Sequence, residues 1–139
     1  MMNDALGATL KIASAGLQAQ STRLRVVAEN LANADSTATE KGGDPYRRKT
    51  VSFDTAMDRA VGVEVVRVKQ IGRDRSDFPL AYDPSHPAAD DKGYVKRPNV
   101  QSLIEMMDMR EAGRSFEASM NVIEQSRAMM NRVVDLLRS

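Results

Sequence analysis

The sequence contains no cysteine and no tryptophan, and aromatic residues make up only 4% of its 139 residues. Without cysteine the chain has no disulfide, no thiol nucleophile and no thiolate ligand for a metal. A compact core of this size normally uses more aromatic side chains than these. The absences therefore exclude a disulfide-stapled scaffold and thiol-dependent catalysis.

An excess of either charge is also missing, because 20 Lys and Arg oppose 19 Asp and Glu and the formal net charge is +1. This balance gives no global reason to expect a nucleic acid or an anionic membrane as partner. The longest uncharged run covers residues 12–22, whereas a membrane-spanning helix needs about 20 apolar residues. The start Met1-Met2-Asn3-Asp4 has no apolar stretch behind it, so we expect no cleaved signal peptide and no direct membrane insertion.

The chain divides by composition into three segments. All five prolines lie in residues 34–98, while residues 1–33 and 99–139 have none, and the last segment holds six of the nine methionines. We predict an N-terminal axial helix, a middle segment of short strands and loops, and a C-terminal axial helix, forming one structural unit whose ends pair. The expected fold class is mainly α with a small β region, the terminal helices pairing as a coiled-coil-like bundle.

An apolar stripe with alternating steps of three and four residues runs through the first segment. This 3.5-residue period is typical of a helix that packs along its length against another helix. Its large apolar members are Leu6, Leu10, Leu17, Leu24, Val27 and Leu31, and Ala13 and Gln20 occupy the two remaining positions of the stripe.

A second stripe of the same period follows Pro98, with Asn99 as the expected N-cap of the helix. Helices of these two lengths would be roughly 45 and 60 Å long, more than a compact chain of this size can cover. We therefore expect both stripes to form assembly interfaces with other subunits. The second stripe includes Met106, Phe116, Met120, Ile123, Met130, Val134 and Leu137.

The middle segment shows β-branched runs at residues 51–53 and 61–71, which we predict to be strands. The apolar positions change phase between Val65 and Val66, which indicates a bulge or a change of register. Glycine, aspartate and proline clusters at residues 42–45 and 83–87 predict turns.

Groups for catalysis are scarce, since His86 is the only histidine. With Asp83, Asp90 and Asp91 it offers the donors of a metal site, and an enzyme using His86 is one hypothesis. The simpler interpretation is a turn stiffened by two prolines, because no second histidine completes a familiar site. We predict no catalytic residue, no metal and no cofactor.

One basic cluster, Tyr46-Arg47-Arg48-Lys49, stands at the start of the predicted strands. Three cations beside an aromatic ring are compatible with nucleic-acid binding, and the alternative function is a soluble coiled-coil adaptor that binds nucleic acid weakly through this cluster. A solvated strand edge, or contact with an acidic neighbour, is the favoured interpretation.

Several motifs resemble a known family over nearly the whole chain. Residues 14–20 (SAGLQAQ) and 28–34 (AENLANA) resemble the N-terminal signature of the axial proteins of the bacterial flagellum, which form its rod, hook and filament junctions. Residues 45–49, 82–87, 105–109 and 114–118 narrow the resemblance to the proximal rod proteins within that family. The signature residues are Asn30, Asn33, Tyr46, Arg47, Arg48, Asp83, Pro84, His86, Pro87, Pro98 and Asn99.

The resemblance implies a structural subunit of the flagellar basal body and not an enzyme. Such a subunit is exported by the flagellar type III apparatus without a cleaved signal peptide. It then assembles into the periplasm-spanning rod, the drive shaft that transmits torque and surrounds the export channel. The implied partners are other rod proteins, components at the base of the basal body, further copies of the chain and the export apparatus, with no nucleic acid.

Overall fold

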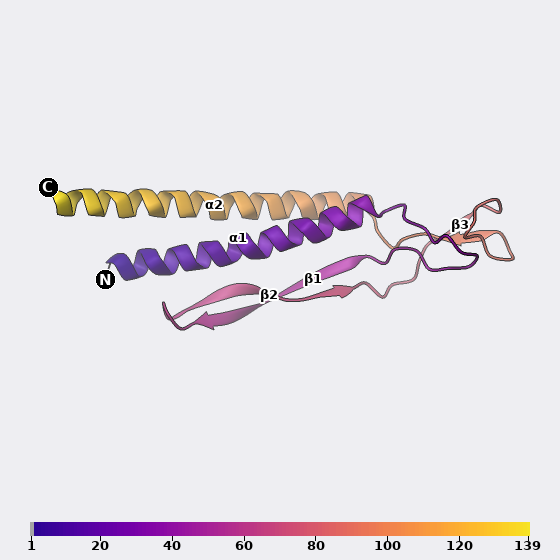
Figure 1. Cartoon of the computed structure of the whole chain (residues 1–139), viewed down its shortest axis with the longest axis horizontal. Helices are drawn as coiled ribbons and strands as arrows, with labels where there is room; N and C mark the ends of the chain where they lie inside the picture. Colours follow the sequence, from indigo (N-terminus) through magenta and orange to yellow (C-terminus); the bar gives the residue numbers. More distant parts are fainter. Residues whose placement is uncertain (1) are drawn as a thin grey trace. The chain divides into compact units, whose positions relative to one another are not determined.

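The structure, a computed structural model, describes residues 2–139. Its elements are α1 (Met2–Ala32), β1 (Lys49–Asp58), β2 (Val63–Arg73), β3 (Leu80–Tyr82), β4 (Tyr94–Lys96) and α2 (Ser102–Arg138) (Figure 1). Two long helices with short antiparallel strands between them confirm the predicted class, mainly α with a small β region. Within the described residues, neither helix is long and apolar enough to cross a membrane.

The end of α1 lies where the sequence predicts it. The Asn33 backbone N–H donates to the Glu29 carbonyl at 3.1 Å, and the Asn33 side-chain amide donates to the same carbonyl at 2.8 Å. The Ser36 hydroxyl then donates to Asn33 Oδ1 at 2.9 Å. These bonds use a helix carbonyl that would otherwise lack a partner, so the helix ends in residues that favour turns.

The start of α2 differs from the prediction. The helix begins at Ser102 and its first turn closes with the Glu105 N–H donating to the Gln101 carbonyl at 3.1 Å. Asn99 is not the N-cap, because its Oδ1 accepts a hydrogen bond from the Arg48 backbone N–H at 2.7 Å. Gln101 instead precedes the first helical residue, so the helix starts two residues further along the chain than expected, and Asn99 is engaged with a distant segment.

The strands form two separate two-stranded sheets, β1 with β2 and β3 with β4. The strands β1 and β2 extend beyond the predicted residue 53 and residue 71, and Gly62, with φ of +70°, stands at the turn between them. Val65 and Val66 are both half-buried, as a change of phase requires, although the bulge itself stays a prediction. The β3–β4 pair, with Ala81 opposite Val95, was not predicted because each strand has only three residues.

The chain forms two compact units, and both helices contribute residues to each of them. Unit 1 contains Met1–Leu24, Ser52–Gln70 and Arg110–Ser139, and unit 2 contains Arg25–Val51 and Ile71–Met109. The β1–β2 ribbon of unit 1 lies beside α1 in Figure 1, and Val66 of β2 lines one pocket together with Ile12 and Val122.

Small side chains let the helices approach closely in unit 1. A Cβ added to Gly16 of α1 would lie 3.2 Å from the Ser119 hydroxyl oxygen of α2, which is tighter than ordinary van der Waals contact. The buried residues of this unit are Leu6, Ala13 and Ala19 of α1 and Ala112 and Ser126 of α2. The helices of unit 1 therefore pack together through alanine, glycine and serine.

Unit 2 has a small core of Ala88, Ala89 and Val95, against which Ala38 packs. Beside it Gly93 adopts φ of +85°, and an added Cβ would lie 3.0 Å from Tyr82 Cε1. Both the backbone conformation and the close ring require glycine at this position. The core thus fixes the loops around β3 and β4 with few apolar side chains.

Candidate functional site

A buried polar network in unit 2 has Asn30 at its centre. The Asn30 side chain is 1% exposed. Its Oδ1 accepts hydrogen bonds from the Tyr46 hydroxyl at 2.7 Å and from the Lys49 N–H at 2.9 Å. Its Nδ2 donates to the Lys49 carbonyl at 2.9 Å and to Glu105 Oε2 at 3.3 Å. All four hydrogen-bonding positions of this amide are used, which is what burial of a polar group requires.

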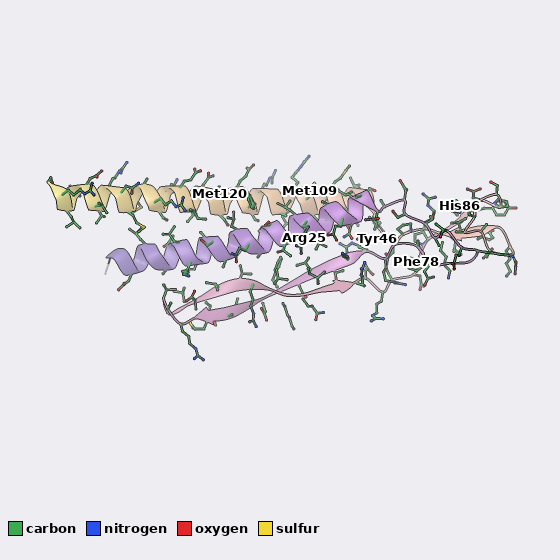
Figure 2. All side chains as sticks on the ribbon, in the orientation of Figure 1. Arg25, Tyr46, Phe78, His86, Met109 and Met120 are labelled. Atoms are coloured by element: carbon green, nitrogen blue, oxygen red, sulfur yellow. The ribbon has the colours of Figure 1, made fainter. Side chains whose placement is uncertain are left out.

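The segment from Pro45 to Lys49 brings the partners of Asn30 back to the end of α1. Pro45 is buried, and the Tyr46 N–H donates to the Ser36 carbonyl at 2.9 Å. Figure 2 shows Tyr46 near the C-terminal end of α1. Burial raises the pKa of the Tyr46 phenol, so the hydroxyl keeps the proton that it donates to Asn30.

Arg48 is surrounded by three carboxylates. Its Nε donates to Oε1 of Glu105, whose side chain is 0% exposed, and its Nη atoms lie 3.5 Å from Asp74 Oδ2 and 3.6 Å from Asp108 Oδ2. Burial by itself would lower the pKa of Arg48, but the hydrogen bond and charge of Glu105 and the two aspartates raise it overall. The buried Glu105 charge is therefore paired, as a buried carboxylate must be.

Asn99 connects this cluster to the loop at residues 74–76. Its Nδ2 donates to the Asp74 carbonyl at 3.0 Å and the Ser76 carbonyl at 3.2 Å, while its Oδ1 accepts from Arg48. The backbone N–H and hydroxyl of Ser76, and then Arg48, hold the pKa of the Asp74 carboxyl below its usual value. Asn99 is thus a link between three segments.

The predicted contact of the basic cluster with acidic neighbours is confirmed. Lys49 Nζ lies 2.6 Å from Glu29 Oε2, in addition to the contacts of Arg48 described above. Arg47 donates to the Asp74 carbonyl at 2.8 Å, and its guanidinium lies 4.2 Å from the centre of the Phe78 ring. All three cations of the cluster therefore contact groups of the chain itself.

His86 belongs to the predicted turn. The Asp83 carbonyl accepts from the His86 N–H at 3.1 Å, and His86 Nδ1 accepts from the Ala88 N–H at 2.9 Å. A neutral ring therefore carries its proton on Nε2, which lies 3.2 Å from the Thr37 hydroxyl. Figure 2 shows His86 among the loops around β3. In the part of the chain that the structure describes, no three His, Asp or Glu side chains are grouped to hold a metal ion.

The predicted stripe of α1 faces inward over much of its length. Leu6 and Val27 are buried, and Leu10, Leu17, Leu24 and Leu31 are half-buried. Their role as an assembly interface stays a prediction.

The predicted stripe of α2 lies mostly at the surface. Phe116 and Ile123 are half-buried, but Met106 is 58% and Leu137 is 80% exposed, and Met120, Met130 and Val134 are exposed as well. A row of inward positions recurs at seven-residue intervals, and its members directly precede Met106, Met120 and Val134 of the predicted stripe or lie one or two heptads from those positions. They are Glu105, Ala112, Ser119, Ser126 and Val133.

The sequence interpretation missed Glu105, Asp74 and Asp108 as site residues. Glu105 shares the seven-residue phase of Ala112 and Ser126, a signal that was present in the sequence. A search for hydrophobic periodicity cannot find such a row, because alanine, serine and glutamate have little hydrophobic side-chain surface. Asp74 lies far along the chain from both helices, and no periodicity marks it.

Two hollows lie beside these features. In unit 2 a cavity of about 170 Å³ is lined by Arg48, Asp74, Asn99 and Glu105 among others. In unit 1 a more apolar groove of about 370 Å³ is lined by Ile12, Gly16, Val66, Ala118 and Val122 among others.

Two family models match the ends of the chain. Residues 10–38 match a model described as flagella basal body rod protein. Residues 91–136 match a model described as the C-terminal part of the flagellar basal body rod FlgEFG proteins. Together they cover most of α1, nearly all of α2, and Asn30, Asn99 and Glu105 of the polar network.

Full-length relatives extend this similarity across the middle segment. The chain is 56% identical over 136 residues to flagellar basal-body rod protein FlgC of Agrobacterium fabrum, covering 98% of each chain. It is 36% identical to FlgC of Borreliella burgdorferi, covering 96% of this chain and 98% of that protein. It is 35% identical to FlgC of Bacillus subtilis, covering 92% and 95%.

Proposed function

Because the chain belongs to the FlgC family of flagellar basal-body rod proteins, we propose that it is a structural subunit of the proximal rod. It assembles through α1 and α2 into the drive shaft that transmits torque and surrounds the export channel. Torque transmission requires stiff, closely packed contacts and no chemistry, so the polar network braces the fold and carries no catalytic role.

The observation that carries the proposal is the apolar surface of α2. A monomeric protein rarely exposes an apolar surface of this extent, and such surfaces mark interaction sites. Methionine side chains suit contacts with several non-identical neighbours, because they are flexible and polarisable. The exposed apolar side chains of α2 are Leu103, Ile104, Met106, Met107, Met120, Val122, Met129, Met130, Val134, Leu136 and Leu137.

The helices fit a coiled-coil-like arrangement. The inward residues of α2 recur every seven positions, and those of α1 include Leu6, Ala13 and Val27 at multiples of seven. The inner row supports pairing within the chain, while the outer face of α2 supports contacts between chains. Each subunit therefore presents apolar surface to more than one neighbour.

The partners follow from this role. They are other rod proteins, components at the base of the basal body and further copies of the chain, with the flagellar type III export apparatus acting before assembly. The site of action is the periplasm-spanning rod. We expect no nucleic acid as a partner, and the contacts of residues 47–49 with protein groups support this expectation.

Imaging of purified basal bodies at subunit resolution tests the proposal. We expect the chain in the proximal rod with the outer face of α2 covered by neighbouring subunits. Density for the chain elsewhere in the basal body, or an α2 face open to solvent in the assembled rod, would contradict the proposal. A salt-sensitive affinity of the purified chain for DNA would instead favour the adaptor hypothesis.

A further inference from the structure

The inner face of α2 is a row of small residues with one charged member. Ala112, Ser119 and Ser126 stand seven residues apart and are buried or half-buried, and Glu105 stands seven residues before Ala112. Glu105 is the only charged residue in this row and is fully buried. The row therefore consists of small residues from Ala112 to Ser126, continues with the larger Val133, and carries a charge only at Glu105.

A uniform row of small residues defines the pairing register poorly. In unit 1 Gly16 of α1 lies against Ser119. A slip of one heptad would place Ala112 or Ser126 against Gly16, and both side chains are as small as that of Ser119. The contacts of these small side chains consequently provide little discrimination between the observed register and its neighbours.

Glu105 does distinguish the registers. Its two carboxylate oxygens accept hydrogen bonds from Asn30 of α1 and from Arg48, and Arg48 belongs to the segment that is itself bonded to Asn30 through Lys49. The pairs Asn30–Glu105 and Gly16–Ser119 are fourteen residues apart on each helix, which is two heptads. A slipped register would leave a buried carboxylate without these donors, which is strongly unfavourable.

We propose that the buried Glu105–Asn30 hydrogen bond, completed by Arg48, sets the heptad register of α1 against α2. Glu105 acts as a positioning residue, comparable to a single buried polar residue that selects register in a coiled coil. The role concerns the fold of the chain itself and holds independently of assembly into a rod.

Disulfide trapping in the full chain measures the register directly, and the absence of native cysteine makes the assay clean. Three double variants report the register: Gly16→Cys with Ser119→Cys for the observed pairing, and Gly16→Cys with Ala112→Cys or with Ser126→Cys for the two slips. We expect the observed pair to form at least about tenfold faster than either slipped pair. Equal rates for the three pairs would overturn the proposal.

Glu105→Leu then removes the charge and leaves an apolar row. Arg48 keeps its contacts with Asp74 and Asp108, and Asn30 keeps the Lys49 carbonyl, so no buried group loses all its partners. We expect the helix content measured by circular dichroism to stay unchanged while the three disulfides form at rates within about threefold of one another. A variant that still forms only the Gly16–Ser119 pairing would overturn the proposal.

Glu111→Leu is the matched control, because Glu111 lies on the same helix and pairs with Arg23 at 3.3 Å, yet its side chain is 71% exposed. We expect the observed pairing to keep its tenfold advantage, and a comparable loss of register in this control would overturn the specific role of Glu105. If Glu105→Leu does not fold, Glu105→Gln provides the test, because its single amide oxygen can accept from Asn30 Nδ2 or from Arg48 Nε but not from both, and the other donor then faces an N–H. Slipped disulfides must then increase, and their absence would also overturn the proposal.

Discussion

The Tyr46 hydroxyl donates a 2.7 Å hydrogen bond to Oδ1 of Asn30, sixteen residues earlier in the chain. Asn30 lies near the end of α1, and Tyr46 lies in the irregular segment that precedes β1. The bond therefore ties that segment to the helix at a buried point. Substitution of either residue therefore measures how much the hydrogen bond contributes to the stability of the folded chain.

Asn30→Ala should destabilise the purified chain by about 2–4 kcal/mol, because it leaves several buried donors and acceptors without a partner. Tyr46→Phe should cost only about 1 kcal/mol, since Oδ1 still accepts from the Lys49 N–H. Urea unfolding monitored by circular dichroism measures both values. Tyr82→Phe, at an exposed ring, is the control and should change little; an equal cost for all three variants would contradict the account of the network.

Asp74 should make stability depend on pH at the acid end. Ser76 and Arg48 lower the pKa of its carboxyl in the folded chain, so its contribution is present above the unfolded pKa of about 3.9. The contribution is lost as the pH falls through the lower folded value. In Asp74→Asn the unfolding free energy should therefore fall less steeply between about pH 5 and pH 2 than in the wild type.

Urea unfolding at a series of pH values provides the measurement for Asp74. Asp77→Asn, an exposed position three residues along the chain, is the control and should follow the wild-type curve. If the unfolding free energy of the wild type and of Asp74→Asn decreased identically at acid pH, the Ser76 and Arg48 contacts would not stabilise the folded chain.

Leu24→Asp and Ile123→Asp should block rod assembly. Leu24 is half-buried on the stripe of α1, and Ile123 is one of the two half-buried members of the α2 stripe. Burial of an unpaired carboxylate in an apolar contact is strongly unfavourable. We expect both variants to be expressed, with few completed basal bodies and no swimming. Arg25→Gln, at an exposed position next to Leu24, should swim nearly normally. Normal swimming by both aspartate variants would refute the role of the stripes in assembly.

His86→Asn should leave motility nearly intact. The asparagine Oδ1 stands close to the position of His86 Nδ1 and accepts the Ala88 N–H, so the turn keeps its central hydrogen bond. Swimming assays and metal analysis of the purified chain check this expectation. A stoichiometric metal in the wild type that is lost in His86→Asn would support a metal site instead of a turn.

The purified monomer should show its fastest amide exchange at the ends of the chain. The outer apolar face of α2 lacks a cover in the free chain, and isolated helices fray. The hydrogen bonds around Asn30 and Asn99 should slow exchange at residues 46–49 and 74–76 relative to residues 6–15. Hydrogen exchange with mass spectrometry tests the gradient, and strong uniform protection of residues 6–31 in a monomer would contradict it.

Periodicity predicted the two helices well and their contacts only in part. The end of α1 was predictable because Asn33 and Ser36 favour caps and turns, and the length of α2 was predictable from its apolar repeats. The inner face of α2 was not predictable, because Ala112, Ser119 and Ser126 have too little apolar surface to form a visible hydrophobic pattern next to Met106 and Met120. The stripe of large residues marks the outer face instead.

The polar network shows the second limit of sequence interpretation. The family resemblance singled out Asn30, Tyr46, Arg48 and Asn99 without saying that they meet. Their hydrogen bonds join segments up to 75 residues apart, as between Asn30 and Glu105. No local pattern encodes such a contact. Asn99, which the sequence predicted as a helix cap, instead accepts a hydrogen bond from the Arg48 backbone N–H.

The small side chains between the helices of unit 1 also determine how much work it takes to pull them apart. Each buried CH₂ contributes about 0.8 kcal/mol, and Ala13, Ala19, Ala112 and Ser126 bring few such groups to the contact. Opening this pair in a lone chain therefore costs little per helical turn. A subunit threaded through a narrow passage before assembly, as proposed here, needs such a low resistance to straightening. Its mechanical strength then resides in the finished polymer, where many weak contacts act in parallel.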